Sequence, residues 1–155
     1  MMASVKFDVT RRFDADPRVV WDSLIDWPSH GAWIPLTSID EAEPGADPTT
    51  VGYTFTGWTG FRPLALEDRM RVTRCDWDDD ARSGFCSVDK IGPVLGGDAG
   101  FTVRPDGTGS ELVWHEAVTV PYLPGFLSPL AAWFGSIGFK LALGRFDRFL
   151  ARTTA

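Results

Sequence analysis

The stretch FDADPRVVWDSLIDWPSHGAWIP, residues 13–35, carries three tryptophans at intervals of six residues: Trp21, Trp27 and Trp33. Six residues match neither the helical nor the strand repeat, so a single regular element cannot turn all three indoles to one side. The backbone therefore has to change direction within this stretch, and the fold still has to accommodate three large apolar rings.

Signals for two short helices lie within these residues. Pro17 suits the first turn of a helix, and Asp14 or Asp16 is placed to cap it. This helix ends before Pro28, because the residue that precedes a proline is pushed out of the α region. The residues SHGAW predict a second helical turn, which ends before Pro35. We expect two short helices joined at an angle.

The composition is that of one globular domain spanning residues 1–155. Hydrophobic residues make up 44% of the chain and charged residues 23%, which disfavours disorder. The net charge of −6 argues against a nucleic-acid surface, since such a surface needs clustered lysine and arginine. The chain contains no Asn and no Gln, so polar contacts to a ligand have to come from carboxylates, cations, hydroxyls, indoles or the backbone.

Three further features bear on location and on cysteine chemistry. The first residues, MMASVKFDV, contain no apolar run of signal-peptide length, so we expect a cytoplasmic protein. Cys75 and Cys86 flank a predicted turn and are expected to remain reduced thiols. The uncharged run 117–139 is long enough to cross a bilayer, but its prolines argue against a transmembrane helix.

Strands and one long helix account for the rest of the chain. Residues 4–13 alternate between apolar and polar side chains and predict a strand. Residues 36–121 consist of strand runs and turns without a helix between them, which predicts about six antiparallel strands. Residues 129–152 predict the longest helix, in which Phe134, Ile137 and Leu141 are expected to face the sheet. They belong to an apolar stripe that begins at Leu130 and is continued around the helix by Leu143, Phe146 and Leu150.

This order of elements, together with the residues DADPRVVWDSLIDWPSHGAWIP, resembles the START-like (SRPBCC) superfamily, in particular its polyketide cyclase/dehydrase branch. The strand GTGSELVW and the long C-terminal helix extend the resemblance over nearly the whole chain. It implies an α+β helix-grip fold, in which a curved antiparallel sheet wraps around the C-terminal helix and two short helices close one end. It also implies a cavity between sheet and helix, with Trp21, Trp27 and Trp33 as hinge and lid residues.

The apolar faces of the predicted elements supply the lining of such a cavity. The residues expected to contact a ligand are Tyr53, Phe55, Met70, Phe101, Trp114, Phe134, Ile137 and Leu141. The residues expected at the entrance are Trp27, Trp33, Tyr122 and Phe126. Tyr122 and Phe126 belong to the uncharged loop PYLPGFLSP, which either packs into the core or forms a rim that covers the cavity or touches a membrane during ligand exchange.

Two acidic residues fall on predicted apolar faces. Strict alternation puts Asp68 on the face of Leu66 and Met70, and it puts Glu116 on the face of Trp114. A carboxylate on the concave side of a sheet loses water, which raises its pKa toward a range useful for acid–base catalysis. The alternative is a bulge or a rim position that turns either side chain to solvent.

Arg11 completes the set of candidate catalytic residues, because it lies on the apolar face of its strand and is a candidate counter-charge for the two acids. No metal site is expected: the pair His115-Glu116 lacks the second histidine of a zinc helix, and His30 is not placed near it. No cofactor is expected either.

Three classes of function fit these observations. The first is a carrier or binder of a hydrophobic small molecule of lipid, polyketide or isoprenoid type, which needs an apolar cavity with a few polar anchors. The second is a polyketide cyclase or dehydratase that uses Asp68 and Glu116 for acid–base catalysis, with Arg11 orienting a carbonyl. The third is a regulatory module that binds another protein and uses no cavity. We favour the first.

Overall fold

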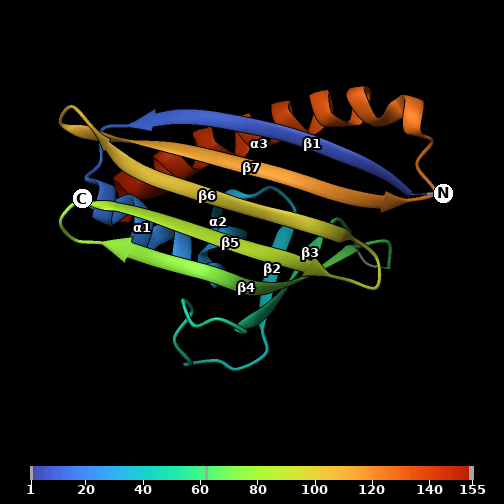
Figure 1. Cartoon of the computed structure of the whole chain (residues 1–155), viewed down its shortest axis with the longest axis horizontal. Helices are drawn as coiled ribbons and strands as arrows, with labels where there is room; N and C mark the ends of the chain where they lie inside the picture. Colours follow the sequence, from blue (N-terminus) through green and yellow to red (C-terminus); the bar gives the residue numbers. More distant parts are fainter. Residues whose placement is uncertain (1, 62, 154–155) are drawn as a thin grey trace.

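The computed structural model describes residues 2–61 and 63–153, and within them seven strands form one antiparallel sheet (Figure 1). The order across the sheet is β1-β7-β6-β5-β4-β3-β2, so the first strand pairs with the last and the others follow as a meander. The strands are β1 (Met2–Phe13), β2 (Thr37–Glu41), β3 (Thr54–Thr59), β4 (Leu66–Asp78), β5 (Ser83–Ile91), β6 (Gly96–Asp106) and β7 (Gly109–Pro121). The predicted run of about six strands after the short helices is confirmed.

The short helices form where the sequence signals place them. The helix α1 (Pro17–Ile25) begins at Pro17, and the backbone N–H of Arg18 donates to the Asp16 carboxylate at 2.9 Å. A 3₁₀ turn, η1 (Trp27–Ser29), contains Pro28, and the one-turn helix α2 (His30–Trp33) follows it directly. The two predicted helices and the cap at Asp16 are therefore confirmed.

The three indoles fill the concave side of the sheet. Trp21 lies against the bare backbone of Gly84 in β5, where a Cβ atom would overlap its ring. Trp27 stacks on Phe55 with ring centroids 4.4 Å apart, and Trp33 is fully buried. The expectation that they are hinge and lid residues is wrong, because all three are at most 2% exposed and belong to the core.

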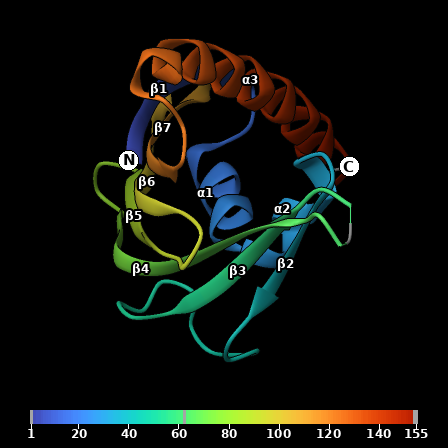
Figure 2. The same ribbon diagram turned by 90° about the vertical axis from the view of Figure 1, so that its right-hand side faces the viewer.

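The longest helix, α3 (Ser128–Thr153), runs alongside β1 and closes the open side of the curved sheet (Figures 1 and 2). Its predicted extent is confirmed, but the predicted inner stripe is wrong. Phe134 is 61% exposed, Ile137 37% and Leu141 66%. The residues that pack into the core come from the opposite side of the helix: Ala142, Leu143, Phe146 and Leu150.

Side-chain size and charge explain this choice of face. Gly135 approaches Phe7 of β1 so closely that a Cβ atom would lie 2.7 Å from its ring. On the other side, the line of Leu141 continues through Arg145 and Arg148, which are exposed. The side of α3 that carries Gly135 therefore packs against β1, and the side that carries the cations stays in water.

Which face of α3 is buried can be tested with Leu141 and Leu143, which lie two positions apart in the helix. Leu143 is fully buried, so Leu143→Asp should lower the free energy of unfolding by several kcal/mol, because it buries an unpaired charge. Leu141→Asp should change it by about 0.5 kcal/mol or less, since position 141 faces water. Urea denaturation followed by circular dichroism measures both. Equal losses in the two variants would contradict the observed register.

Candidate functional site

A cavity of about 170 Å³ lies between the concave face of the sheet, the α2 turn and α3. Its walls are mainly apolar and aromatic, and among the residues predicted to contact a ligand, Phe55, Met70, Phe101 and Trp114 line it. Thr59 lines it as well and is exposed, so the cavity reaches the surface near the paired ends of β2 and β3. The other lining residues are Trp27, His30, Ile34, Thr37, Ile39, Gly57, Asp68, Cys86, Val88, Lys90, Ala99, Gly100, Glu116 and Phe139.

One wall of the cavity carries a buried cluster of one cation and two carboxylates. Lys90 Nζ donates to Asp68 Oδ2 at 2.5 Å and lies 3.4 Å from Glu116 Oε2. The indole N–H of Trp114 donates to Glu116 Oε1 at 3.0 Å. The three strands β4, β5 and β7 supply these side chains, which are 21%, 4% and 12% exposed for Asp68, Lys90 and Glu116.

Burial and charge act in opposite directions on this cluster. Burial by itself lowers the pKa of Lys90, but the charges of Glu116 and Asp68 raise that pKa above its ordinary value, so the ammonium stays protonated at neutral pH. Burial raises the pKa of Glu116, and the charge of Lys90 and the Trp114 hydrogen bond reduce the increase without cancelling it. The cluster thus holds a fixed cation beside an acid whose proton is held more tightly than usual.

Asp68 has one oxygen that the protein leaves unpaired. Its Oδ2 atom accepts from Lys90, whereas Oδ1 is buried and has no hydrogen-bond partner among the described residues. A buried acceptor without a partner costs about 1–3 kcal/mol. A hydroxyl or amide that donated to Oδ1 would recover this free energy, so this oxygen is a candidate polar anchor in the cavity.

His30 contributes an uncharged ring to the same cavity. Its Nε2 atom lies 2.7 Å from the carbonyl oxygen of Leu24, to which the neutral ring donates. Burial lowers the pKa of His30 from 6.5 to about 4, although the bond to Leu24 acts to raise it. The ring sits among Trp27, Trp33 and Trp114, with centroid distances of 5.4, 4.8 and 6.2 Å.

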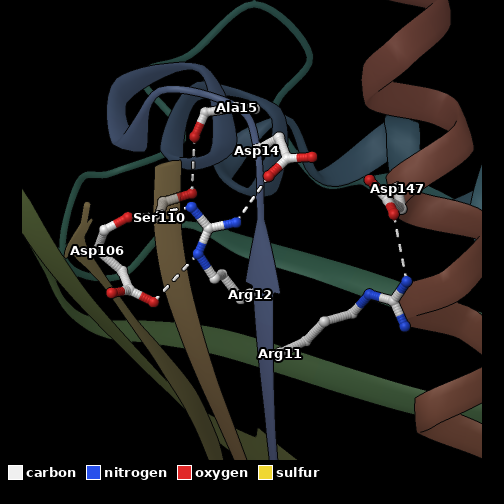
Figure 3. A network of polar contacts seen from close by, with 7 residues as sticks. All are labelled: Arg11, Arg12, Asp14, Ala15, Asp106, Ser110 and Asp147. Carbon is white, nitrogen blue, oxygen red and sulfur yellow. Dashed lines mark hydrogen bonds and ion pairs between the residues drawn. The ribbon is translucent and has the colours of Figure 1, made fainter. Parts of the chain in front are cut away.

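Arg11 does not reach the cavity. Its guanidinium turns toward α3 and forms an ion pair with Asp147 at 3.2 Å, while Arg12 pairs with Asp14 and Asp106 (Figure 3). The alternation that placed Arg11 on the inner face of β1 is correct, but β1 is an edge strand and its neighbour on that face is α3. Arg11 therefore ties the edge strand to the helix and is not the counter-charge of the two acids.

Several other predicted residues also lie outside the cavity lining. Tyr53 is buried, and its hydroxyl hydrogen-bonds the carboxylate of Glu41 in β2. Trp33 packs behind the lining against Phe146, with ring centroids 4.8 Å apart. The expected contacts Phe134, Ile137 and Leu141 and the expected entrance residues Tyr122 and Phe126 are exposed and do not line it, since α3 turns the opposite face inward.

The sequence reasoning missed Lys90 and Phe139. Lys90 follows Gly84, Cys86 and Val88 at intervals of two on the buried face of β5, so strict alternation was a usable signal. Two acids on a concave face also call for a buried cation. Phe139 was missed because the helix stripe was assigned to the wrong side. Among the described residues, no group of three His, Cys, Asp or Glu side chains is arranged to hold a metal ion.

Comparison with known proteins gives one family and several similar folds. The family model described as polyketide cyclase / dehydrase and lipid transport matches residues 4–152. No curated protein sequence matches the chain. A solved structure from Thermus thermophilus is similar with a TM-score of 0.72, at 13% identity over 97% of this chain and 99% of that one.

Two more solved structures share the fold. A START superfamily protein from Mycobacterium smegmatis has a TM-score of 0.69 and 10% identity, over 96% of this chain and 98% of that one. A STAR-related lipid transfer protein from Xanthomonas axonopodis has a TM-score of 0.68 and 15% identity, over 94% of this chain and 85% of that one. At these identities the likeness concerns the fold.

His30 provides a test of the buried wall that needs no ligand. The unfolded chain takes up a proton as pH falls below 6.5, whereas folded His30 does so only near pH 4, so stability should fall between pH 7 and pH 5. The share due to His30 is about 2 kcal/mol. His30→Gln keeps a donor toward Leu24 and removes the titration, so the variant should lose about 2 kcal/mol less than wild type over this interval. Urea midpoints at the two pH values measure the difference, and an unchanged pH dependence would show that His30 is not buried as a neutral ring.

Proposed function

This chain belongs to the polyketide cyclase/dehydrase and lipid transport family, and from that premise we propose that it binds a hydrophobic small molecule of lipid, polyketide or isoprenoid type in the cavity between the sheet and α3. The START-like (SRPBCC) resemblance of the sequence is thereby confirmed, and the family supports hydrophobic ligand binding in general. On this proposal residues 1–155 act as one ligand-binding domain.

The unpaired Asp68 Oδ1 supports a more specific proposal, which concerns the polar group of the ligand. An apolar wall alone selects for shape, whereas a buried acceptor beside a protonated Lys90 selects for a ligand with a hydroxyl or amide donor at one end. The cluster also carries more negative than positive groups, which disfavours a free carboxylate at this position. The ligand is therefore an apolar body with one neutral polar group.

The size of the cavity limits the ligand. A volume of about 170 Å³ is smaller than the roughly 300–1,000 Å³ that drug-sized ligands occupy. A small ring or a short chain fits the cavity as it stands. A larger ligand has to displace part of the lining, and Phe139 is the one lining residue that α3 contributes.

Cavity filling tests the proposal directly. A Cβ atom at Gly57 meets only ordinary contacts, with Ile39 Cδ1 at 3.5 Å and Met70 Cε at 3.6 Å, so Gly57→Val narrows the cavity without backbone strain. Binding of the small neutral probe cyclohexanol, measured by isothermal titration calorimetry, should weaken about tenfold. Thr56→Val, on the other face of the same strand, is the matched control and should bind as wild type does. If both variants bind the probe equally well, the probe site lies elsewhere.

A second function, acid–base catalysis on a polyketide-like substrate, is favoured by one observation. Glu116 has a raised pKa and lies beside the protonated Lys90, an arrangement in which it can pass a proton to a carbonyl whose developing negative charge the ammonium stabilises. Arg11 has no part in this version, because it is paired with Asp147.

The pH dependence of binding separates a donor role of Glu116 from a purely apolar site. A neutral Glu116 can donate to a ligand carbonyl and an ionised one cannot, so affinity for a hydrophobic ketone should fall as pH rises through the raised pKa. Glu116→Gln keeps a donor and should give a flat profile with binding retained. Glu111→Gln, on the same strand and paired with Arg104 at the surface, is the control and should follow wild type. Should all three proteins give one and the same profile, Glu116 takes no part in binding.

A further inference from the structure

The first half of α3 presents an apolar surface to solvent. We call this surface the outer face of α3; it consists of the residues opposite the core-facing Phe139, Ala142 and Phe146. Their exposed fractions are 51% for Leu130, 58% for Trp133, 61% for Phe134, 37% for Ile137 and 66% for Leu141. Phe126, four residues before Leu130, is 82% exposed and extends the line.

The apolar composition of this exposed surface indicates that it binds a partner. Scattered exposed leucines are ordinary, but aromatic and aliphatic side chains in one continuous helical line mark a binding surface. The segment Gly125–Thr153 has a mean hydropathy of 1.4 over its most apolar 18 residues, of which 11% are buried inside the protein. By length and composition alone this helix is able to cross a membrane.

The packing of α3 against the protein excludes a helix that crosses the membrane, and it is compatible with a helix that lies at the membrane surface. Leu143, Phe146 and Leu150 are buried in the core, and Asp147 is paired with Arg11 of β1, so the second half of the helix is committed to the protein. A helix held in this way can lie in the plane of a bilayer surface with its outer face among the lipids.

Charge indicates the kind of bilayer. Beyond Leu141 the same face continues through Arg145, Arg148 and Arg152, which are exposed, as is Lys140. Residues 122–153 carry these four cations and the single acid Asp147, a net charge of +3 in a chain whose overall charge is −6. A face that begins with tryptophan and phenylalanine and ends in arginines matches the headgroup region of an anionic membrane.

A second copy of the chain fits this face less well. A two-fold pairing of antiparallel α3 helices sets the arginine end of one helix against the aromatic end of the other. It would place Arg148 and Arg152 on apolar side chains of the partner, where the outer face supplies no carboxylate, since Asp147 already pairs with Arg11. We propose that the outer face of α3 docks this protein on the surface of an anionic lipid bilayer.

Vesicle flotation tests the proposal with lipids of stated composition. Wild type should float with vesicles of phosphatidylcholine mixed with phosphatidylglycerol and much less with phosphatidylcholine alone, and added salt should weaken the binding. The double change Trp133→Ser and Phe134→Ser should lower the partition coefficient roughly tenfold or more. The double change Arg148→Glu and Arg152→Glu should remove the preference for phosphatidylglycerol.

The matched control is Val51→Ser. Val51 is 69% exposed and belongs to the loop between β2 and β3. This loop lies on the opposite side of the molecule from α3 in both ribbon views (Figures 1 and 2). The Val51→Ser variant should bind vesicles as wild type does. The cavity-filling variant Gly57→Val should do so as well, because docking does not depend on the proposed ligand. If the protein binds the probe but does not dock on vesicles, the docking proposal fails and the proposed function stands. If it docks but does not bind the probe, the proposed function fails and docking stands.

Quenching by brominated lipid locates the contact even if the serine variants fail to fold. Trp133 should be quenched on docking, and Trp133→Phe should abolish most of the quenching while retaining flotation, because Phe keeps the apolar contact. Two results overturn the proposal. One is flotation that is absent or independent of the arginines. The other is a dimer in sedimentation experiments that the change Trp133→Ser and Phe134→Ser disrupts, which would assign the outer face to a second copy of the chain.

Discussion

The contact between Trp21 and Gly84 sets the geometry on which the rest of the structure depends. A strongly curved sheet leaves a concave surface that has to be filled, and the absence of a side chain at Gly84 lets an indole lie directly on the backbone of β5. Trp21 also meets Phe101 with ring centroids 5.6 Å apart, so α1 is held to two strands at once. With α1 held in this way, the break at Pro28 brings Trp27 over Phe55 and His30 to the edge of the cavity. The cavity is the part of the concave surface that these rings leave uncovered.

Lys90 imposes the second constraint, because a buried ammonium has to be paired. Removing one partner of a buried ion pair costs about 3–5 kcal/mol, which is a large share of the stability of a domain of this size. Asp68 and Glu116 share the cation unequally, at 2.5 and 3.4 Å, and Asp68 Oδ1 takes no part in the pairing. Burial raises the pKa of Glu116, and the nearby charge of Lys90 only reduces the increase. The same cluster thus stabilises the sheet and provides the polar end of the cavity.

The sequence predicted the fold and part of the site, and the limits of that prediction have physical causes. Alternation placed Asp68 and Glu116 on the inner face correctly, because their strands bury one face and a slip of one residue would expose every apolar side chain. Alternation was equally correct for Arg11, but a strand pattern does not tell which element covers an edge strand. For α3 the apolar residues surround the first half of the helix, so periodicity alone did not choose a face. The contact of Gly135 with Phe7 joins elements far apart in the sequence, so periodicity does not reveal it. The arginines beyond Leu141 are a local signal for the solvent side of the helix.

The two faces of α3 connect the cavity to the surface. Phe139 closes the cavity from the inside, with its ring centroid 4.5 Å from that of Trp114, while Ile137 and Leu141 on either side of it point to solvent. The buried residues of α3 all lie in its second half, whereas the first half contacts the sheet through Gly135 against Phe7 and through Phe139 against Phe7 and Trp114. The first half therefore separates from the sheet at a lower free-energy cost than the second. On the proposed function, a ligand too large for 170 Å³ would have to displace part of the lining, and a displaced Phe139 would be an apolar ring that water disfavours and lipid accepts. A bilayer at the proposed outer face of α3 would thus lower the cost of moving Phe139, at a different place from the surface opening near Thr59.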